Sequence, residues 1–271
     1  MSLLTDRPAL LRQRARAARV GVEGFLHQSA ILDVQDRIAL VNKTFTSGVV
    51  VTGHPEIWSD AFPEWSMAAD EEVLGLAEGQ FDLVVHAMAL HWANDPVGQL
   101  IQCRRALRPD GLLLAIFPGG QTLHQLRAVL AEAEIARTGG LSPRIAPMGE
   151  VRDLGGLLQR AGLALPVADT ITLRALYPDA LRLMHDLRAM GEGNALDGRT
   201  RRPTPRGLLL DAAARYADAY PAPEGGIEAT FELITLTGWA PDDSQPKALR
   251  PGSAQQRLAD ALGTTEEPVR D

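Results

Sequence analysis

The amino-acid sequence predicts an α/β protein built on a parallel sheet, with a helical layer before the sheet and a helical cap after it. Three stretches carry the prediction: "FDLVVHAMAL", then "DPVGQLIQCRRALRP", then "DGLLLAIFP". The first and third are unbroken apolar runs, typical of strands buried on both faces, and the second has the apolar spacing of a helix. A strand, a helix and a strand with short links form a right-handed crossover, so the two strands are expected to be parallel.

The first strand is expected in "SGVVVTG", where the run Val49 to Val51 is β-branched. The turn after it contains one glycine, Gly53, followed by His54 and Pro55. Only about 15 residues separate Gly53 from the stretch "SMAAD". We expect this segment to be too short for a complete first helix plus a second strand.

The N-terminal stretch predicts helices. Arginines alternate with leucine and alanine over residues 5–30, and the pattern runs into "FLHQSAILDVQDRIALVNKTF" with no visible boundary. Transit peptides and membrane-surface helices are also rich in arginine, so both stay open as alternatives. We favour a helical layer packed on the domain.

Further elements follow the crossover. The pattern predicts helices over 119–136, 149–161, 178–190 and 205–219, and strands near 164–173 and in "GGIEATFELITLTGWA". We therefore divide the chain into an N-terminal helical layer (1–45), a core (46–175), a helical cap (176–225), a C-terminal strand region of the core (226–245) and a polar tail (246–271).

The bulk composition indicates a globular protein. The chain has 271 residues, 45% of them hydrophobic, and a formal net charge of -7. The acidic balance disfavours nucleic-acid binding, which requires a basic face. No apolar run approaches the roughly 20 residues of a membrane span, and no signal peptide is visible. The single cysteine, Cys103, fits a reducing compartment and is expected to be a small buried side chain, so we expect a cytoplasmic protein.

Five stretches carry a family resemblance. "FDLVVHAMALHWANDPVGQLIQCRRALRPDGLLLAIFPGG" resembles the second half of a class I S-adenosylmethionine-dependent methyltransferase, which has a Rossmann-like fold. With it, "GGQTLHQLRAVLAEAE", "GGLSPRIAPMGEVRDLGGLLQRAGL", "YPDALRLMHDLRAMGEGNAL" and "ATFELITLTGWAP" are similar to the methyltransferase-like assembly factors of respiratory complex I. A more distant similarity is to the malonyl-carrier-protein methyltransferases of biotin synthesis. The resemblance covers roughly residues 5 to 250.

The resemblance implies a site for S-adenosylmethionine at the carboxyl ends of the strands. Asp70 matches the acidic residue that accepts a hydrogen bond from the adenine amino group. His91 would be an optional general base, and Trp92 a wall of the substrate pocket. The full set of expected cofactor-binding residues is Thr52, Gly53, Asp70, Glu71, His86, Ala87 and Leu90.

The first half of the predicted core is degenerate. A working cofactor site needs an Asp/Glu-x-Gly-x-Gly turn, because only glycines let the backbone approach the cofactor closely. It also needs an acid at the end of the second strand for the ribose, and here only Glu56 and Asp60 lie nearby. Two functions stay open. One is methyl transfer to a protein or small acceptor, with the cofactor held in an altered pose by Thr52, Gly53 and Asp70. The other is a pseudo-methyltransferase or arginine-modifying protein that assembles a respiratory subunit.

Other residues predict contacts with a substrate or a partner. Ser142 and Arg144 lie in a proline-stiffened loop expected above the cleft, where Arg144 would bind an acidic group or form a surface ion pair. Arg201 and Arg202, in "GRTRRPTPR", predict either a docking surface for an acidic protein or a solvated loop. The histidine spacing matches no metal-binding motif, so we expect no metal site.

Overall fold

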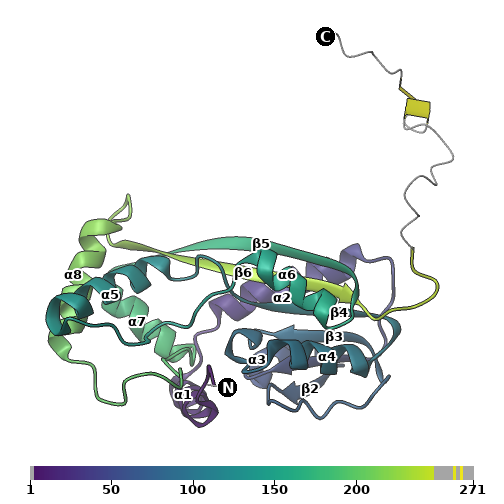
Figure 1. Cartoon of the computed structure of the whole chain (residues 1–271), viewed down its shortest axis with the longest axis horizontal. Coiled ribbons are helices and arrows are strands. Elements are labelled where there is room, and N and C mark those ends of the chain that lie inside the picture. Colours follow the sequence, from purple (N-terminus) through teal and green to yellow (C-terminus); the bar gives the residue numbers. More distant parts are fainter. Residues whose placement is uncertain (1–2, 247–258, 261–262, 265–271) are drawn as a thin grey trace. The chain divides into compact units, whose positions relative to one another are not determined.

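The computed structural model describes residues 3–246, 259–260 and 263–264. The chain forms two units, Met1–Pro241 and Asp242–Asp271, and the first holds the folded domain. It is built on a six-stranded sheet in the order β2-β1-β3-β4-β6-β5, with helices on both faces (Figure 1). Most of the polar tail predicted over 246–271 lies outside the described residues. In the parts of the chain that are described, no helix is long and apolar enough to cross a membrane.

The helices and strands have the following bounds. The strands are β1 (Gly48–Thr52), β2 (Ser66–Ala69), β3 (Phe81–Ala87), β4 (Leu107–Pro118), β5 (Ala164–Tyr177) and β6 (Ile227–Trp239). The helices are α1 (Arg7–Val20), α2 (Phe25–Leu40), α3 (Pro55–Ala61), the short 3-10 turn η1 (Leu90–Trp92), α4 (Pro96–Ala106), α5 (His124–Thr138), α6 (Val151–Arg160), α7 (Ala180–Ala189) and α8 (Arg206–Ala219).

The sheet confirms the predicted α/β class and the parallel crossover. Strands β2, β1, β3 and β4 pair in parallel with one another. Strand β6 is antiparallel to both β4 and β5, so the sheet as a whole is mixed. The crossover helix α4 begins at Pro96, which suits the first helical position, and Asp95 caps it by accepting a hydrogen bond from the Gly98 nitrogen at 2.8 Å.

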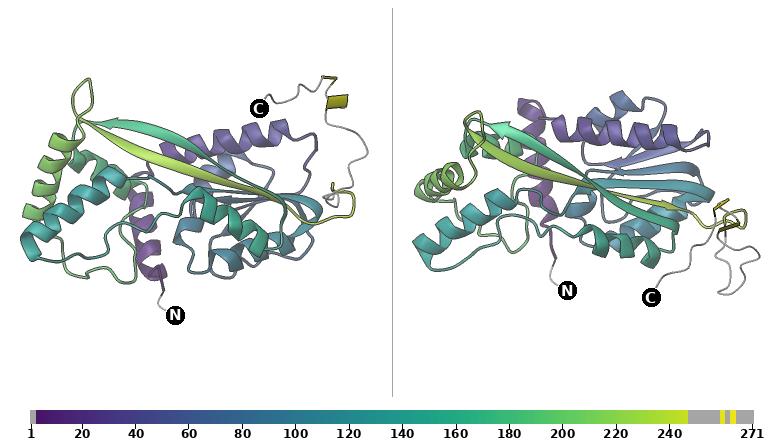
Figure 2. Two further views of the ribbon diagram at one scale, coloured as in Figure 1. Left: turned by 45° about the horizontal axis from the view of Figure 1, so that its top comes forward. Right: turned by 90° about the horizontal axis from the view of Figure 1, so that it is seen from above.

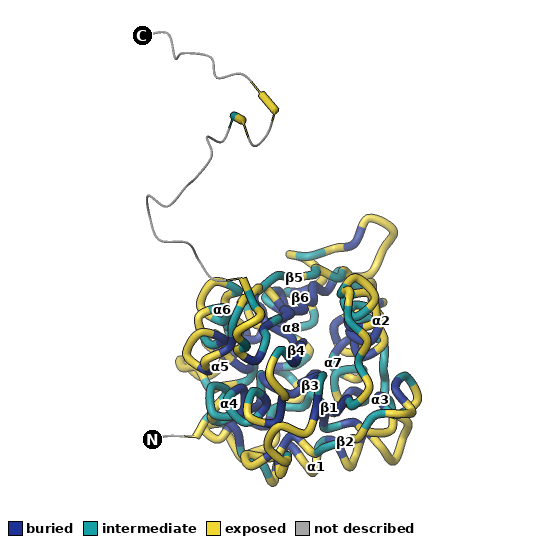
Figure 3. Tube along the Cα trace, turned by 90° about the vertical axis from the view of Figure 1, so that its right-hand side faces the viewer, coloured by how far each residue is buried: buried dark blue, intermediate teal, exposed yellow. Residues whose placement is uncertain are grey.

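Helices cover the two faces of the sheet with separate apolar cores. Helices α2 and α3 pack on one face, where Val34 and Trp58 lie against Val50 and Val85. Helices α4 and α6 pack on the other face (Figure 3). Cys103 of α4 is fully buried there. Burial raises the pKa of the Cys103 thiol to about 12, so this cysteine is a packing residue, as expected.

The N-terminal helical stretch is divided, contrary to the continuous pattern expected from the sequence. Helix α1 ends at Val20, and Gly21 adopts a φ of 90°, a conformation that side-chain-bearing residues rarely adopt. Helix α2 then starts at Phe25 and packs on the sheet. Because Gly21 breaks the helix, α1 turns away from α2 and crosses the carboxyl end of the sheet (Figure 2).

The segment after Gly53 also differs from expectation. We expected it to be too short for a complete first helix plus a second strand, but it holds a short helix and a short strand. Helix α3 has only seven residues and starts at Pro55, whose fixed φ suits a first helical position. Strand β2 has four residues and pairs in parallel with β1, from Val49 opposite Ser66 to Thr52 opposite Ala69. Asp70 therefore directly follows the strand next to β1.

The cap helices connect β5 to β6 and pack at the end of this antiparallel pair where β5 ends and β6 begins. Helices α7 and α8 pack with α5 into one apolar core that includes Leu183, Tyr216 and Phe231. The Tyr216 hydroxyl donates a hydrogen bond of 2.9 Å to the Glu228 carbonyl, which joins α8 to β6. We keep the boundary of the cap at 176–225 as a proposal.

Candidate functional site

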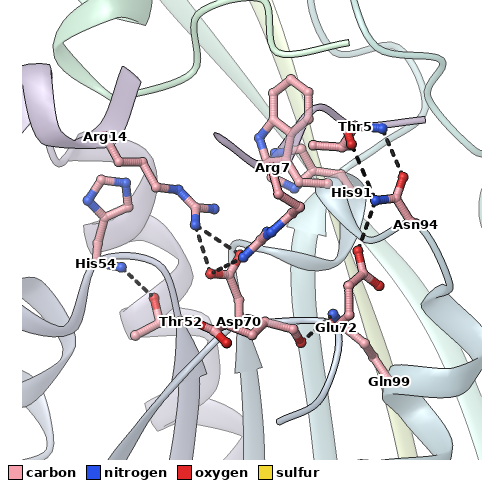
Figure 4. A network of polar contacts seen from close by, with 12 residues as sticks. Thr5, Arg7, Arg14, Thr52, His54, Asp70, Glu72, His91, Asn94 and Gln99 are labelled. Atoms are coloured by element: carbon pink, nitrogen blue, oxygen red, sulfur yellow. Dashed lines mark hydrogen bonds and ion pairs between the residues drawn. The ribbon is translucent and has the colours of Figure 1, made fainter. Parts of the chain in front are cut away.

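The candidate site lies where the parallel strands end. Thr52, Ala87 and Asp70 stand at the carboxyl ends of β1, β3 and β2, where open α/β sheets bind ligands. Helix α1 passes over this edge, and Figure 4 shows that Arg7 and Arg14 both reach from it toward Asp70. The site is thus built from the sheet edge and the N-terminal helix together.

Asp70 is held in a buried ion pair. Nη1 of Arg14 donates to its two carboxylate oxygens at 2.8 and 2.9 Å, and Arg7 reaches the same oxygens at 3.2 and 3.3 Å. Only 3% of Asp70 is exposed. Burial alone would raise the pKa of Asp70, but the charge and hydrogen bonds of Arg14, aided by Arg7, hold it below its usual value. The carboxylate is therefore ionised and engaged by two guanidinium groups.

Gly53 faces the same guanidinium. A Cβ atom built on Gly53 would overlap the side chain of Arg14, so only glycine allows this close approach. Thr52 is buried beside it, and its hydroxyl oxygen accepts a hydrogen bond of 3.2 Å from the His54 nitrogen. The space that a cofactor would enter above the β1 turn holds the Arg14 side chain.

In this arrangement the residues do not fit S-adenosylmethionine. The family pattern requires free backbone space at the glycine turn and a free carboxylate at the end of the second strand. Here the Arg14 side chain fills the space at the glycine turn, and Arg14 and Arg7 both bind the Asp70 carboxylate. The resemblance assigned Asp70 to the adenine amino group, and no ribose acid was evident in the sequence. Asp70 directly follows β2, the strand next to β1, which is where the ribose-binding acid is expected. The two acids considered for that role lie elsewhere: Glu56 pairs with His54 at 3.2 Å, and Asp60 is exposed.

Several buried polar atoms around Arg14 have no hydrogen-bond partner among the described residues. They are Nε and Nη2 of Arg14, Nε2 of His54 and Nδ1 of His91. The ring of His27 packs edge-on against His54, and its Nδ1 accepts a hydrogen bond of 3.0 Å from Trp58. Burial lowers the pKa of His27 to about 3, so this ring is neutral.

His86, expected at the cofactor, lies inside the sheet. It is fully buried in β3, and its Nε2 contacts the Gln99 Oε1 at 2.7 Å. Gln99 in turn donates to the carbonyl of Glu71 at 3.0 Å, while the side chain of Glu71 is exposed. Burial lowers the pKa of His86. This residue therefore links β3, α4 and the segment after β2, and Ala87 and Leu90 are buried beyond it.

A cavity of about 210 Å³ lies between the end of β4 and the helical cap. Its walls are mostly apolar and come from α2, α5, α7 and β6; they include Leu26, Leu123, Leu126, Met184, Leu187 and Phe231. Its polar side chains include His91, Trp92, Arg144, Glu192 and Asn194. The predicted position of His91 and Trp92 beside a cleft agrees with this geometry, and their roles stay predictions.

Glu192 organises the inner end of the cavity, a role that the sequence did not predict. Its Oε2 accepts a hydrogen bond of 2.7 Å from Trp92 Nε1 and lies 3.1 Å from His91 Nε2. Burial would raise its pKa, but His91, Arg14 and the Trp92 hydrogen bond lower it to about 2. Glu192 is therefore ionised. The only sequence signal is an acid within the glycine-rich segment "GEGN" that follows α7.

The loop residues Ser142 and Arg144 are both bound to Glu134 of α5. The Ser142 hydroxyl donates to Glu134 at 2.7 Å, and Arg144 donates to it at 2.6 and 3.0 Å. Arg144 also reaches Thr204 Oγ1 at 3.0 Å. The hydrogen bonds from Arg144, together with those from Ser142, lower the pKa of Glu134 to about 2. Arg144 thus forms an ion pair with Glu134 and also lines the cavity, and its binding of an acidic group on a ligand or partner stays a prediction.

The remaining predicted partner residues lie away from the cavity. Arg201 is 65% exposed and contacts Asp6 at 3.3 Å and Asp197 at 3.8 Å. Arg202 is exposed, and neither arginine lines the cavity. Across the described residues, no group of three or more His, Cys, Asp and Glu side chains is arranged to hold a metal ion.

Comparison with known proteins gives matches at three levels. A model of the methyltransferase domain matches residues 55–115. In sequence, the chain is 40% identical over 198 residues to a zebrafish (Danio rerio) protein named arginine-hydroxylase NDUFAF5, mitochondrial, covering 73% of this chain and 61% of that protein. It is 35% identical over 176 residues to the malonyl-[acyl-carrier protein] O-methyltransferase of a Methylovorus strain, covering 65% of this chain and 57% of that one.

The fold has a solved counterpart. The crystal structure of a putative methyltransferase from Bacillus halodurans aligns with a TM-score of 0.51 at 13% identity, covering 79% of this chain and 100% of that chain. The likeness is one of fold. The chain spans about three-fifths of the length of the curated relatives it matches.

Proposed function

We propose that the chain uses its methyltransferase-like fold to bind a partner and does not transfer methyl groups from S-adenosylmethionine. The partner in this proposal is a subunit of a respiratory complex, the class of partner that the family resemblance implies. The proposal concerns a chain that matches only part of its longer relatives.

One observation carries the proposal: the Arg14 guanidinium lies between Gly53 and Asp70, where the cofactor would lie. For the cofactor to enter, Arg14 must leave a buried carboxylate. Separating a buried ion pair costs about 3–5 kcal/mol when one partner is left uncompensated. The cofactor would have to offset this cost before it gained any net affinity.

The exposed arginines of the loop after α7 support an acidic partner. Arg202 is exposed and Arg201 is largely so, and they lie in a run that contains four arginines. Exposed cations of this kind accelerate association with acidic surfaces. The zebrafish relative is named as mitochondrial. For this chain we retain a cytoplasmic location as a proposal that rests on its single cysteine.

A second candidate is methyl transfer after α1 has moved aside. It is favoured by Gly53 and Asp70, which are both present beneath Arg14, and by the buried polar atoms around them that have no partner among the described residues. Arginine hydroxylation, which the name of the zebrafish protein states for that protein, ranks behind it. The cavity carboxylate that would meet a guanidinium group, Glu192, is already engaged by His91 and Trp92.

Calorimetric titration of the whole chain with S-adenosylmethionine and S-adenosylhomocysteine tests the proposal. We expect no binding to the wild-type chain at millimolar ligand. Arg14→Ala opens the site, and Arg12→Ala, an exposed arginine of the same helix, is the matched control. Micromolar binding by the wild-type chain that Asp70→Ala abolishes would overturn the proposal. Binding by Arg14→Ala alone would support the blockade by Arg14.

The proposed binding of a respiratory subunit is tested by a separate measurement. Purified respiratory subunits with acidic surfaces are titrated against the chain by biolayer interferometry. We expect a subunit that binds, with an affinity that falls at least fivefold in the double variant Arg201→Glu, Arg202→Glu. If no such subunit binds the wild-type chain, the binding role is wrong, whatever the cofactor titration shows.

A further inference from the structure

We propose that the cavity under α7 and the groove beside it together bind an anionic amphiphile, a ligand with an aliphatic chain and a carboxylate or phosphate head. The groove, here called the arginine groove, has a volume of about 470 Å³ and is lined by Arg16, Arg144, Arg188, Arg199, Thr200 and Thr204 among other residues. This site is separate from the blocked edge at Asp70, so the inference does not depend on the proposed function.

The cavity and the arginine groove are continuous. Leu130, Met184 and Arg188 line both of them, as do Arg144, Gly193 and Asn194. The shared residues come from α5, from α7 and from the segments that follow these helices. A single ligand can therefore contact the apolar cavity and the charged groove at the same time.

The charged side chains that line the arginine groove are all positive. Four arginines line it and no aspartate or glutamate does, in a chain whose formal net charge is -7. Two of the four are neutralised, since Arg144 pairs with Glu134 and Arg199 pairs with Asp6 at 2.8 Å. Arg16 and Arg188 are exposed and form no ion pair with any described residue. A carboxylate or phosphate that bridges them would relieve their mutual repulsion and gain charge-assisted hydrogen bonds.

The cavity suits a hydrocarbon chain better than a peptide. Its walls include the side chains of Leu123, Leu126, Leu187 and Phe231, which offer no hydrogen bonds. A peptide backbone in this space would leave amide groups without hydrogen-bond partners, whereas an aliphatic chain has no hydrogen bonds to lose on transfer from water. Met184 adds an adaptable side chain at the junction with the groove.

The inner end of the cavity sets the direction of the ligand. Glu192 is ionised there, and its hydrogen bonds with Trp92 and His91 fix its position. A second anion placed at that end would be repelled by Glu192. The head of the ligand therefore lies at Arg16 and Arg188, and the chain points toward Trp92.

Titration calorimetry of the whole chain with octyl phosphate and octanoate tests the inference, with inorganic phosphate and 1-octanol as the two half-ligands. We expect octyl phosphate to bind at least tenfold more tightly than either half-ligand. Arg188→Gln, a surface change that leaves the core intact, should weaken binding at least fivefold. Met184→Trp, which fills the junction, should abolish binding while the thermal unfolding midpoint shows that the variant is folded. Arg12→Gln is the control outside the groove.

Three results would overturn the inference. The first is equal affinity for inorganic phosphate and octyl phosphate, which would reduce the site to an anion site without a chain pocket. The second is octyl phosphate binding that neither Arg188→Gln nor Met184→Trp changes. The third is binding only to phosphatidylglycerol vesicles or only to an acidic leucine-containing peptide, with no binding of free octyl phosphate or octanoate. In that case the surface would recognise a bilayer or a protein and not a free amphiphile.

Discussion

Arg14 and Asp70 are 56 positions apart in the chain and form an ion pair at 2.8 Å in which both side chains are almost completely buried. The pair links the N-terminal helix to the carboxyl end of the sheet. Asp70 holds the place expected for a cofactor-binding acid, and here it binds a cation from the same chain. The ion pair thus joins two distant segments of the chain in the absence of a cofactor.

Replacing Asp70 should destabilise the protein. Asp70→Asn leaves the Arg14 guanidinium buried without a charge partner, and such a loss costs about 3–5 kcal/mol. Urea denaturation at pH 7 measures the free energy of unfolding. The control is Glu71→Gln, which removes an exposed carboxylate from the next position and should change stability by less than about 0.5 kcal/mol. Equal stability of the two variants would mean that the buried pair contributes nothing.

The packing of Arg14 on Gly53 predicts a coupling between the two positions. Gly53→Ala places a methyl group where the guanidinium lies, so it should cost about 1–3 kcal/mol in the wild-type chain. In an Arg14→Ala background the space is free and the same change should be nearly neutral. A double-mutant cycle by urea denaturation measures this coupling.

A glycine with open space around it provides the control for that cycle. A Cβ on Gly156 of α6 meets no atom within 4 Å. Gly156→Ala should therefore stabilise the helix by about 0.5–1 kcal/mol, with or without Arg14. Costs for Gly53→Ala that are the same in both backgrounds would show that Arg14 does not fill the turn.

The elements predicted correctly from the sequence are those that a local residue pattern specifies. Strands β3 and β4 and helix α4 are specified by apolar spacing within their own residues. Strand β2 was missed because four residues are too few to show a period. The helix break was missed because Gly21 interrupts an otherwise unchanged helical composition.

The site was predicted less completely than the fold, because its contacts join distant parts of the chain. His91 and Glu192 are 101 positions apart, and Arg14 and Asp70 are 56 apart. No periodicity relates such positions. The resemblance drew attention to Asp70, His91 and Trp92, but only the folded chain shows which side chains meet them.

The ion pair between Glu134 and Arg144 predicts acid sensitivity. The pKa of Glu134 is lowered to about 2 in the folded chain, from an ordinary value of 4.5. A lowered carboxyl pKa contributes stability above the unfolded value, and this contribution is lost as the pH falls from about 5 toward 2. Glu134→Gln should therefore be less stable than wild type at pH 7, and the difference should shrink at pH 3. The free energy of unfolding, measured with urea at both pH values, checks this. A constant difference would contradict the prediction.

His27 predicts a second pH dependence, at higher pH. Burial lowers its pKa from 6.5 to about 3, so the unfolded chain binds a proton that the folded chain excludes. This contribution is present above pH 6.5 and is lost as the pH drops from 6.5 toward 3, with a loss of about 1.4 kcal/mol by pH 5.5. His27→Gln cannot titrate, but its amide oxygen can still accept the hydrogen bond from Trp58. Its stability should change less than that of wild type between pH 7.5 and pH 5.5 in urea denaturation. His185→Gln, at a histidine with a 69% exposed side chain, should keep the wild-type dependence. If the stability of His27→Gln falls with pH as steeply as that of wild type, protonation of His27 does not cause the loss of stability in this range.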